Sequence, residues 1–395
     1  MKEISGGITA PVGFKASGTH CGIKTRGKDL ALIYSERETV AQAVFTTNKI
    51  QSASVKLSRE NLQDAKARAI VINSGCANAC TGVRGYKDAR VITALVAREL
   101  GVKKQDVLVA STGIIGRFLP MNKIKSRIKY LAKSLSYGGN TSAARAIMTT
   151  DTSHKEKAVR IEVSGKEVRI GAMGKGAGMI YPSMATMLCF ITTDAVISKS
   201  ALEKALRDSV DKSFHRITVD GDRSTNDSVF ILANGIAGNR KIQSGTEPFS
   251  EFQRALSYIT CEISKMIVKD AEGAKKFIEI KVAGARIEED AKKIGFSIAN
   301  SPLVKTALGA GSSNWGRIAS AIGSAGVNIA EGKLSIFVGD VQVMKNGCLI
   351  DCDVRKVKKL LAGCAIKISI HLNLGQKDCT VWTSDLTEEY VRINK

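Results

Sequence analysis

The chain has 395 residues and 5 prolines, 44% of its residues are hydrophobic and 24% are charged, and its formal net charge is +22. This composition is typical of a globular protein and argues against long disordered tails, and no run of 18 apolar residues exists that could form a transmembrane helix. The N-terminal segment has an early acidic residue, Glu3, and no apolar core, so we expect no signal peptide and a cytoplasmic protein. No linker, internal repeat or low-complexity segment is evident, which favours one compact body.

The net charge of +22 raises the alternative of a basic, non-catalytic nucleic-acid-binding protein, because Lys and Arg neutralise phosphates. The basic residues are interspersed with acidic ones, aromatic residues make up only 5%, and no RNA-binding motif is present. A diffuse positive field also attracts anionic metabolites. We therefore expect small-molecule substrates and no nucleic-acid or membrane partner.

Strands and helices alternate in the first half of the chain. Apolar residues with helical spacing, followed by Gly101, predict a helix over 85–100. Two strands that meet at Ser164-Gly165 predict a hairpin, and an apolar run predicts a strand at 187–192. Further strands are predicted at 30–35, 41–47, 66–75 and 106–112, and further helices at 121–136 and 141–149.

The second half of the chain has the same mixed character. Ser200 with Glu203 and Ser250 with Gln253 have the spacing of capping boxes, so each pair predicts the start of a long helix. Because strands and helices intermix throughout, the predicted class is α/β or α+β with large mixed sheets. The C-terminal third predicts strands at 275–282, 335–338, 340–344, 348–350, 366–371 and 378–383, and helices near 316–324 and 354–361.

Three segments are candidates for metal sites, and we expect no metal. The spaced cysteine pairs in "CANAC" (76–80) and "CLIDC" (348–352) have no histidine nearby, so buried free thiols are favoured over zinc. The segment "TVDGDRSTNDSV" (218–229) lacks the spacing and the terminal Glu of a calcium loop. Its closely spaced polar residues are Asp220, Asp222, Asn226 and Asp227.

Thr186 is a candidate nucleophile in "KGAGMIYPSMATML". If the bond between Ala185 and Thr186 were cut, the new α-amine, with a pKa of roughly 7.7–8, could act as the base for the hydroxyl on the same residue. Self-cleavage requires an attack of this hydroxyl on the preceding carbonyl, and the small residues around it favour that attack. The alternative is a threonine that is hydrogen-bonded in a strand.

Two other segments could contribute to a site. "STGIIG" (111–116) forms a turn at the end of a strand, where a hydroxyl and backbone N–H groups could stabilise an oxyanion; one such donor contributes about 2.7–4 kcal/mol. "INSGCANACTG" (72–82) is a similar loop that could line a pocket. Glu272, in "KDAEGAKKF", is expected at a helix end, where the dipole disfavours a carboxylate, so it is either a ligand group or simply solvated.

Together these motifs identify a resemblance. "STGIIG", "AIMTTDT", "KGAGMI-P-MATML", "KDAEGA-KF" and "NWGRI", in this order, resemble the ornithine acetyltransferase family, the bifunctional glutamate N-acetyltransferases of arginine biosynthesis. The resemblance covers residues 4–394 and implies a fold similar to the N-terminal-nucleophile-like aminopeptidases of the DmpA type, a sandwich of sheets flanked by helices. It also implies self-cleavage into an α chain (1–185) and a β chain (186–395), which remain one compact unit and assemble as an α2β2 heterotetramer.

The resemblance further implies the reaction and its residues. Thr186 would take the acetyl group of N-acetylornithine, release ornithine and pass the acetyl group to glutamate in a ping-pong reaction, with the Thr112 side chain and the Gly113 N–H as oxyanion hole. We infer that Lys175 pairs with a substrate carboxylate and that Glu272 either receives an ammonium or orients the amide. No cofactor is expected, and whether acetyl-CoA is a second acetyl donor stays open. The positions that match substrate contacts are Thr149, Lys175, Thr186, Glu272 and Asn394.

Three departures from the family pattern are visible. In the family, about five residues follow the position of Asn394, and the last of them is a Thr or Ser that contacts substrate. This sequence stops at Lys395 and has no such hydroxyl, so we expect an effect on substrate affinity. Ser312-Ser313 replaces Asp-Pro, and Cys76 replaces an asparagine. None of the three alters the predicted nucleophile or oxyanion hole, so we expect an active enzyme. A self-cleaving aminopeptidase or amidohydrolase, in which water replaces glutamate as the acceptor, remains the nearest alternative.

Overall fold

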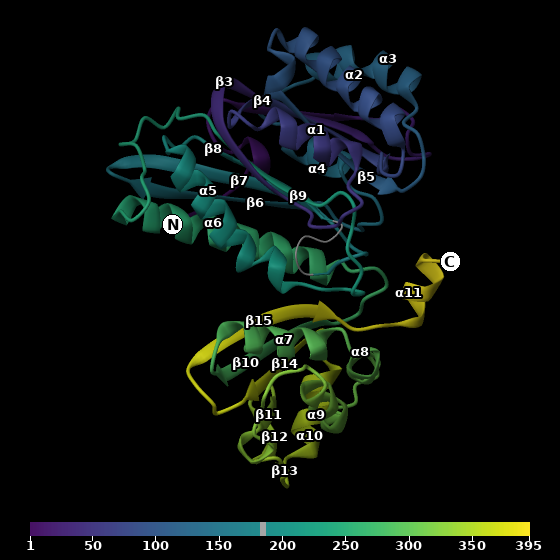
Figure 1. Ribbon diagram of the computed structural model, residues 1–395, viewed down its shortest axis with the longest axis vertical. Coiled ribbons are helices and arrows are strands. Elements are labelled where there is room, and N and C mark those ends of the chain that lie inside the picture. Colours follow the sequence, from purple (N-terminus) through teal and green to yellow (C-terminus); the bar gives the residue numbers. More distant parts are fainter. Residues whose placement is uncertain (182–186) are drawn as a thin grey trace. The chain divides into compact units, whose positions relative to one another are not determined.

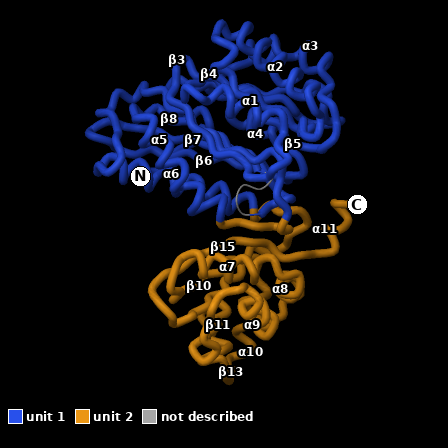
Figure 2. Tube along the Cα trace, viewed as in Figure 1, with its two compact units in different colours: residues 1–215, 222–267 blue, residues 216–221, 268–395 orange. Residues whose placement is uncertain are grey.

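The computed structural model (Figure 1) describes residues 1–181 and 187–395. The predicted cleavage site, Ala185-Thr186, lies outside the described residues. The described chain divides into two compact units, each with its own sheet, and each unit is considered by itself (Figure 2). Unit 1 comprises residues 1–215 and 222–267, and unit 2 comprises residues 216–221 and 268–395.

Within the described residues, unit 1 contains a nine-stranded mixed sheet in the order β1-β6-β7-β8-β9-β3-β4-β5, with β2 paired to β3. Its strands are β1 Lys2–Ile4, β2 Phe14–Thr19, β3 Leu30–Phe45, β4 Lys66–Cys76, β5 Val107–Ile114, β6 Lys155–Val163, β7 Lys166–Lys175, β8 Leu188–Thr193 and β9 Ser228–Ala233. Its helices are α1 Ala53–Asn61, α2 Gly82–Leu100, α3 Met121–Lys133, α4 Asn140–Ala146, α5 Lys199–Asp211 and α6 Glu247–Lys269, whose last two residues belong to unit 2.

Strand β3 is a single strand of 16 residues, so the prediction of two strands at 30–35 and 41–47 was wrong. The pairing of β3 with β4 shifts register between Tyr34 and Thr39, and this irregularity takes up the exposed polar stretch between the two apolar runs. Beyond the shift, residues 40–45 pair with β9. β3 therefore connects the two halves of the sheet.

The two halves of the sheet enclose a common core. Ile72 of β4, Phe190 of β8 and Phe230 of β9 belong to one cluster of buried side chains, to which α4 also contributes. Because side chains alternate along a strand, Val71 of β4 faces the other way and packs with residues of α1, α2 and α3. Helix α5 packs against β3, and Ile263 of α6 lies next to Gly174 of β7. The predicted class, mixed sheets flanked by helices, is confirmed.

The capping boxes predicted for two helices were wrong, since both helices begin earlier than predicted. The N-cap of α5 is Ser198, whose hydroxyl accepts the N–H of the residue three positions on at 3.3 Å, so Ser200 lies within the first turn. The hydroxyl of Thr246 accepts an N–H in the same way before α6, and Ser250 lies inside that helix. Gln253 instead donates to a backbone carbonyl of α5 at 3.2 Å. In both helices the cap is therefore formed by the serine or threonine that comes earlier in the sequence.

Unit 2 contains, within its described residues, a six-stranded sheet in the order β13-β12-β11-β14-β10-β15, in which β10 and β14 are parallel and the other pairs are antiparallel. Helices α7, α8, α9 and α10 contribute apolar residues to its core. The elements are β10 Phe277–Ala285, α7 Glu288–Ala299, α8 Pro302–Gly309, α9 Trp315–Gly323, β11 Ser335–Val338, β12 Val341–Lys345, β13 Cys348–Leu349, α10 Val354–Ala362, β14 Ala365–His371, β15 Lys377–Ser384 and α11 Glu388–Ile393. In the parts of the chain that the structure describes, none of the helices combines the length and apolar character needed to cross a bilayer.

We predict that Phe230→Ala destabilises unit 1 strongly. The Phe230 ring is fully buried and stacks on that of Phe190 with 5.6 Å between centroids, so its removal leaves a cavity in the shared core. The free energy of unfolding should fall by about 3–5 kcal/mol in a urea titration. Val83→Ala, at a side chain that is 72% exposed, is the control and should change the free energy of unfolding by less than about 0.5 kcal/mol. Equal effects of the two substitutions would contradict this account of the core.

Candidate active site

The predicted oxyanion residues lie at the carboxyl end of β5. Thr112 and Gly113 pair with Ser74 and Gly75 on the parallel strand β4, and Thr112 is buried. Gly113 has a φ of +129°, and a Cβ at this position would lie 2.4 Å from the carbonyl carbon of Gly75. Because this gap has no room for a side chain, Gly113 can contribute only its backbone to the site.

A buried carboxylate, Asp151, organises the segments beside these residues. Its Oδ1 accepts hydrogen bonds from Lys155 Nζ at 2.7 Å and from the Gly176 N–H at 2.8 Å, while Oδ2 accepts the Thr149 N–H at 3.0 Å. The Nζ of Lys175 lies 4.0 Å from Oδ2. Helix α4 ends at Ala146 and not at residue 149 as predicted. The backbone of Thr149 is therefore held by this carboxylate and not by a helix.

Burial and charge act on Asp151 in opposite directions. Lys155 and Lys175 are both almost completely buried, and the Asp151 carboxylate lies within 4.0 Å of each ammonium group. Burial alone would raise the pKa of Asp151, but the two ammonium groups and the Gly176 N–H outweigh it and hold the pKa well below its usual range. Asp151 is therefore ionised at neutral pH.

Lys175 connects this cluster to the oxyanion residues. It is the last residue of β7 and pairs with Leu188, the first residue of β8, two positions after Thr186. Its Nζ lies 3.4 Å from the hydroxyl oxygen of Thr112 and can donate to it. Of the predicted site residues in unit 1, the structure thus brings Thr112, Gly113, Thr149 and Lys175 into one neighbourhood.

The two predicted site residues of unit 2 contact each other. Asn394, which directly follows α11, donates its side-chain N–H to Glu272 Oε2 at 2.8 Å. Glu272 lies in a turn three residues after α6 ends at Lys269, so it is not on the helix, and the dipole argument made for it does not apply. The hydroxyl of Thr387 donates to the Gly273 carbonyl at 2.7 Å and holds this turn against the C-terminal segment.

Sequence reasoning missed three residues of the site in unit 1. Asp151 stands within the motif "AIMTTDT", but its role depends on contacts with the end of β7 that spacing alone does not reveal. Asn226 and Asp227 lie in a segment that the sequence suggests only as a metal site, and a metal is not expected there. In the structure their buried side chains bind backbone groups: Asn226 binds the carbonyls of Ala77 and Ser111, and Asp227 binds the N–H of Met187.

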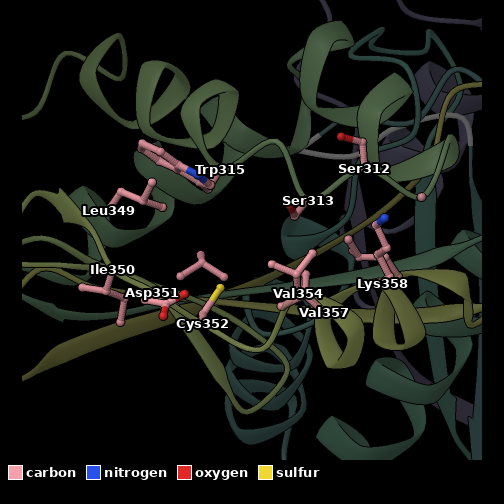
Figure 3. Close-up of a pocket in the computed structure, with 13 residues that line it drawn as sticks. Ser312, Ser313, Trp315, Leu349, Ile350, Asp351, Cys352, Val354, Val357 and Lys358 are labelled. Atoms are coloured by element: carbon pink, nitrogen blue, oxygen red, sulfur yellow. The ribbon is translucent and has the colours of Figure 1, made fainter.

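A cavity of about 550 Å³ lies in unit 2 (Figure 3). Its apolar walls include Trp315, Leu349 and Val354. Lys358 also lines it, as do Ser312 and Ser313, the two residues that replace Asp-Pro of the family pattern. None of the predicted site residues is among those that line it. It is a feature of unit 2 that the predicted reaction does not use.

The described cysteines are free thiols, as expected. The expectation that the two spaced pairs are buried was wrong for three of their four members. Cys76 is buried, but Cys80 and Cys348 are exposed and Cys352 is half-buried. Within the described residues, no group of three or more His, Cys, Asp or Glu side chains is arranged to hold a metal ion.

We predict that Asp151→Asn destabilises unit 1 by roughly 3–5 kcal/mol at neutral pH, because it removes the carboxylate that two buried ammonium groups share. The folded-state pKa of Asp151 lies below its unfolded value of about 3.9, so its contribution is complete above that value and is lost as the pH falls through the folded-state pKa. The difference in unfolding free energy between wild type and variant should therefore be constant above about pH 5 and shrink in acid. Asp208→Asn, which breaks an exposed pair with Lys204, is the control and should cost at most about 1 kcal/mol.

The ArgJ family model matches residues 15–395 of the chain. "Arginine biosynthesis bifunctional protein ArgJ" of Caldanaerobacter subterraneus subsp. tengcongensis is 45% identical over 100% of this chain and 99% of its own length. "Glutamate N-acetyltransferase" of Methanocaldococcus jannaschii is 46% identical over the same shares. The solved ornithine acetyltransferase of Mycobacterium tuberculosis, complexed with ornithine, is 37% identical with a TM-score of 0.42 and covers 45% of this chain and 95% of its own. The resemblance drawn from the motifs is thus confirmed, and the chain belongs to the ArgJ family.

Proposed function

We propose that this chain is a glutamate N-acetyltransferase of arginine biosynthesis, which transfers an acetyl group from N2-acetylornithine to glutamate through an acetyl ester on Thr186. The observation that carries the proposal is the full-length match to curated relatives at 45% and 46% identity that bear these functional names. The cluster of Thr112, Lys175 and Asp151 supports it, because it supplies buried donors and a fixed charge next to the start of β8.

The proposed reaction begins with the amine that cleavage would free at Thr186. This amine takes the proton of the Thr186 hydroxyl as the oxygen attacks the acetyl carbonyl of N-acetylornithine. The tetrahedral intermediate collapses, its C–N bond breaks, and the amine of ornithine leaves with the proton. The amine of glutamate then attacks the ester carbonyl, the C–O bond to Thr186 breaks, and a proton from the attacking amine passes through the Thr186 α-amine to the oxygen. This step restores the hydroxyl and releases N-acetylglutamate. The Thr112 hydroxyl and the Gly113 N–H are the proposed donors to the oxyanion in both steps.

Lys175 is proposed to support the oxyanion hole. Its ammonium lies 3.4 Å from the Thr112 hydroxyl oxygen and has no acceptor capacity, so it can only donate in this contact. A hydroxyl that accepts from Lys175 keeps its own hydrogen free to donate to an oxyanion. Asp151, 4.0 Å from the same ammonium, is shared with Lys155, so the three groups carry a net charge of +1. The supporting role is therefore compatible with the pairing with a substrate carboxylate that we inferred from the sequence.

Glu272 and Asn394 are proposed to bind the amino-acid part of the substrate. Glu272 Oε2 accepts the amide N–H of Asn394 at 2.8 Å, which orients the carboxylate and leaves its second oxygen for an ammonium group. An ammonium is present in the side chain of N-acetylornithine, so these residues match its chemistry. Thr149 is proposed as a further substrate contact.

Strand order supports the proposal that the cut chains remain associated. β8 and β9 follow the proposed cut at 185/186, yet in the sheet they lie between β7 and β3, which precede it. β8 pairs with β7 over six residues and β9 pairs with β3 over six residues. Separation of residues 1–185 from 186–395 would break both ladders. Two such pairs in an α2β2 heterotetramer are part of the proposal.

The acetyl donor is either N-acetylornithine alone or both N-acetylornithine and acetyl-CoA, and an experiment distinguishes these alternatives. One relative is named as a bifunctional protein and the other as a glutamate N-acetyltransferase, at nearly equal identity to this chain. No cofactor is part of the proposed reaction, and acetyl-CoA would enter only as a second acetyl donor. Formation of N-acetylglutamate from acetyl-CoA and glutamate by the purified protein distinguishes the two alternatives.

We predict that the purified protein consists of two fragments that meet at 185/186. Denaturing mass spectrometry should detect residues 1–185 and 186–395 in equal amounts, and Thr186→Ala should remain one chain of 42.2 kDa without transferase activity, because it lacks the attacking hydroxyl. The next residue, Met187, has no hydroxyl and cannot act as a substitute nucleophile. An intact wild-type chain that still turns over substrate would refute the proposed mechanism.

We predict that ornithine release from N-acetylornithine depends on glutamate. With glutamate present, release should continue through many turnovers, and without it release should stop after about one acetyl group per active site, because the acetyl ester has no amine acceptor. The measurement follows ornithine over time at both conditions, with Thr186→Ala as the blank. Equal steady rates with and without glutamate would favour the hydrolase alternative.

A further inference from the structure

Two adjacent buried side chains, Asn226 and Asp227, hold the chain on both sides of the proposed active site. They immediately precede β9, the strand between β8 and β3, and their relative exposures are 4% and 0%. Each side chain binds backbone groups of a distant segment. The reaction as proposed above assigns no role to either residue.

Asn226 binds the segment that carries the oxyanion residues. Its side-chain N–H₂ donates to the carbonyl of Ser111 at 2.8 Å and to the carbonyl of Ala77 at 2.7 Å. The Ser111 carbonyl and the Thr112 N–H belong to the same peptide group, which is planar. A hydrogen bond to this carbonyl therefore fixes the orientation of the plane from which Thr112 projects. The bond to Ala77 ties the neighbouring loop after β4 to the same amide.

Asp227 binds the segment that begins one residue after Thr186. Its Oδ1 accepts the Met187 N–H at 3.0 Å, and the N–H of Ser228 donates to the Met187 carbonyl at 3.3 Å. Both backbone groups of Met187 are thus held by two consecutive residues. These bonds fix the backbone of Met187, the first described residue after the proposed nucleophile.

We infer that Asn226 and Asp227 are positioning residues for acetyl transfer, which hold the peptide group before Thr112 and the backbone of Met187, the residue that follows the proposed nucleophile in the sequence. This inference rests on the proposed function. Two neighbouring residues that directly precede one strand provide a short connection between two described segments that lie far apart in the sequence, namely 111–112 and the start of the segment at 187. A displacement of about 1 Å between reacting groups costs on the order of a hundredfold in rate, so such a connection has a direct effect on turnover.

The carboxyl group of Asp227 can be replaced by an amide in a test of this inference. Oδ2 is buried and accepts no backbone N–H among the described residues. Burial raises the pKa of Asp227 well above its usual range, against the opposing effects of the Met187 N–H, the Lys175 charge and the Ser224 side chain. A neutral amide of the same shape can therefore replace this group and keep the acceptor for Met187.

The test compares variants of the full-length, cut protein for kcat and KM in acetyl transfer, for the rate of cleavage at 185/186, and for thermal stability. Asn226→Ala and Asp227→Ala should each lower kcat about a hundredfold and change KM for N-acetylornithine less than about threefold. Asp227→Asn, which retains the acceptor oxygen, should restore kcat to within about tenfold of wild type. If an alanine variant does not fold, Asn226→Leu and Asp227→Leu, which keep the approximate volume of the side chain but cannot form its hydrogen bonds, provide the same comparison.

Asn239→Ala is the matched control. Asn239 is also a buried asparagine of unit 1, 5% exposed, and its side chain binds both backbone groups of Val196, away from the predicted site residues. The Asn239→Ala substitution should lower the melting temperature as much as Asn226→Ala does but leave kcat within about threefold of wild type. If kcat falls equally in the Asn226, Asp227 and Asn239 alanine variants, or if Asp227→Asn is as inactive as Asp227→Ala, the inference is wrong.

Failure of the proposed function gives a different pattern. A wild-type protein that is cut at 185/186 but transfers no acetyl group would refute the transferase proposal, and the rate of cleavage in the same variants would then decide the positioning inference. In that case Asp227→Ala should cleave about a hundredfold more slowly than wild type and Asn239→Ala at the wild-type rate. An uncut wild-type chain overturns both the proposal and the inference.

Discussion

The candidate site depends on one buried interaction, the contact of the Asp151 carboxylate with the Lys155 and Lys175 ammonium groups. Without this negative charge two positive charges would lie together in the interior, and a buried charge that loses its partner is among the most destabilising features a fold can contain. The same carboxylate holds the backbone at Thr149 and Gly176, so it fixes both the charge and the path of the chain. Lys175 in turn contacts Thr112, and the orientation of the proposed oxyanion hole follows from that contact.

Asn226 and Asp227 have a corresponding geometric effect. Asp151 determines where positive charge lies, whereas these two side chains hold backbone groups of Ser111 and Met187. Both effects are based on buried groups that bind backbone atoms, and Asp151 also binds the Lys155 ammonium. Donors that are fixed in this way stabilise a transition state most effectively.

Much of this arrangement could be predicted from the sequence, because local signals agreed with the fold. The strand that ends at Thr112-Gly113, the helix that ends before Gly101 and the hairpin at Ser164-Gly165 were all predicted within a few residues. The predictions failed where a distant partner decides the outcome. Asp151 is one carboxylate among many until β7 brings Gly176 to it, and β3 is one strand only because β4 and β9 pair with its two ends.

The position of β8 and β9 in the middle of the sheet has a consequence for maturation. A polypeptide interrupted before folding would leave one piece lacking two central strands and another piece with two strands exposed on both edges, and open edges of this kind promote aggregation. The sheet must consequently form from an uninterrupted chain, and the proposed scission can only be the last event. Under the proposed mechanism, the strand order thus favours folding of a single precursor first and release of the Thr186 amine afterwards.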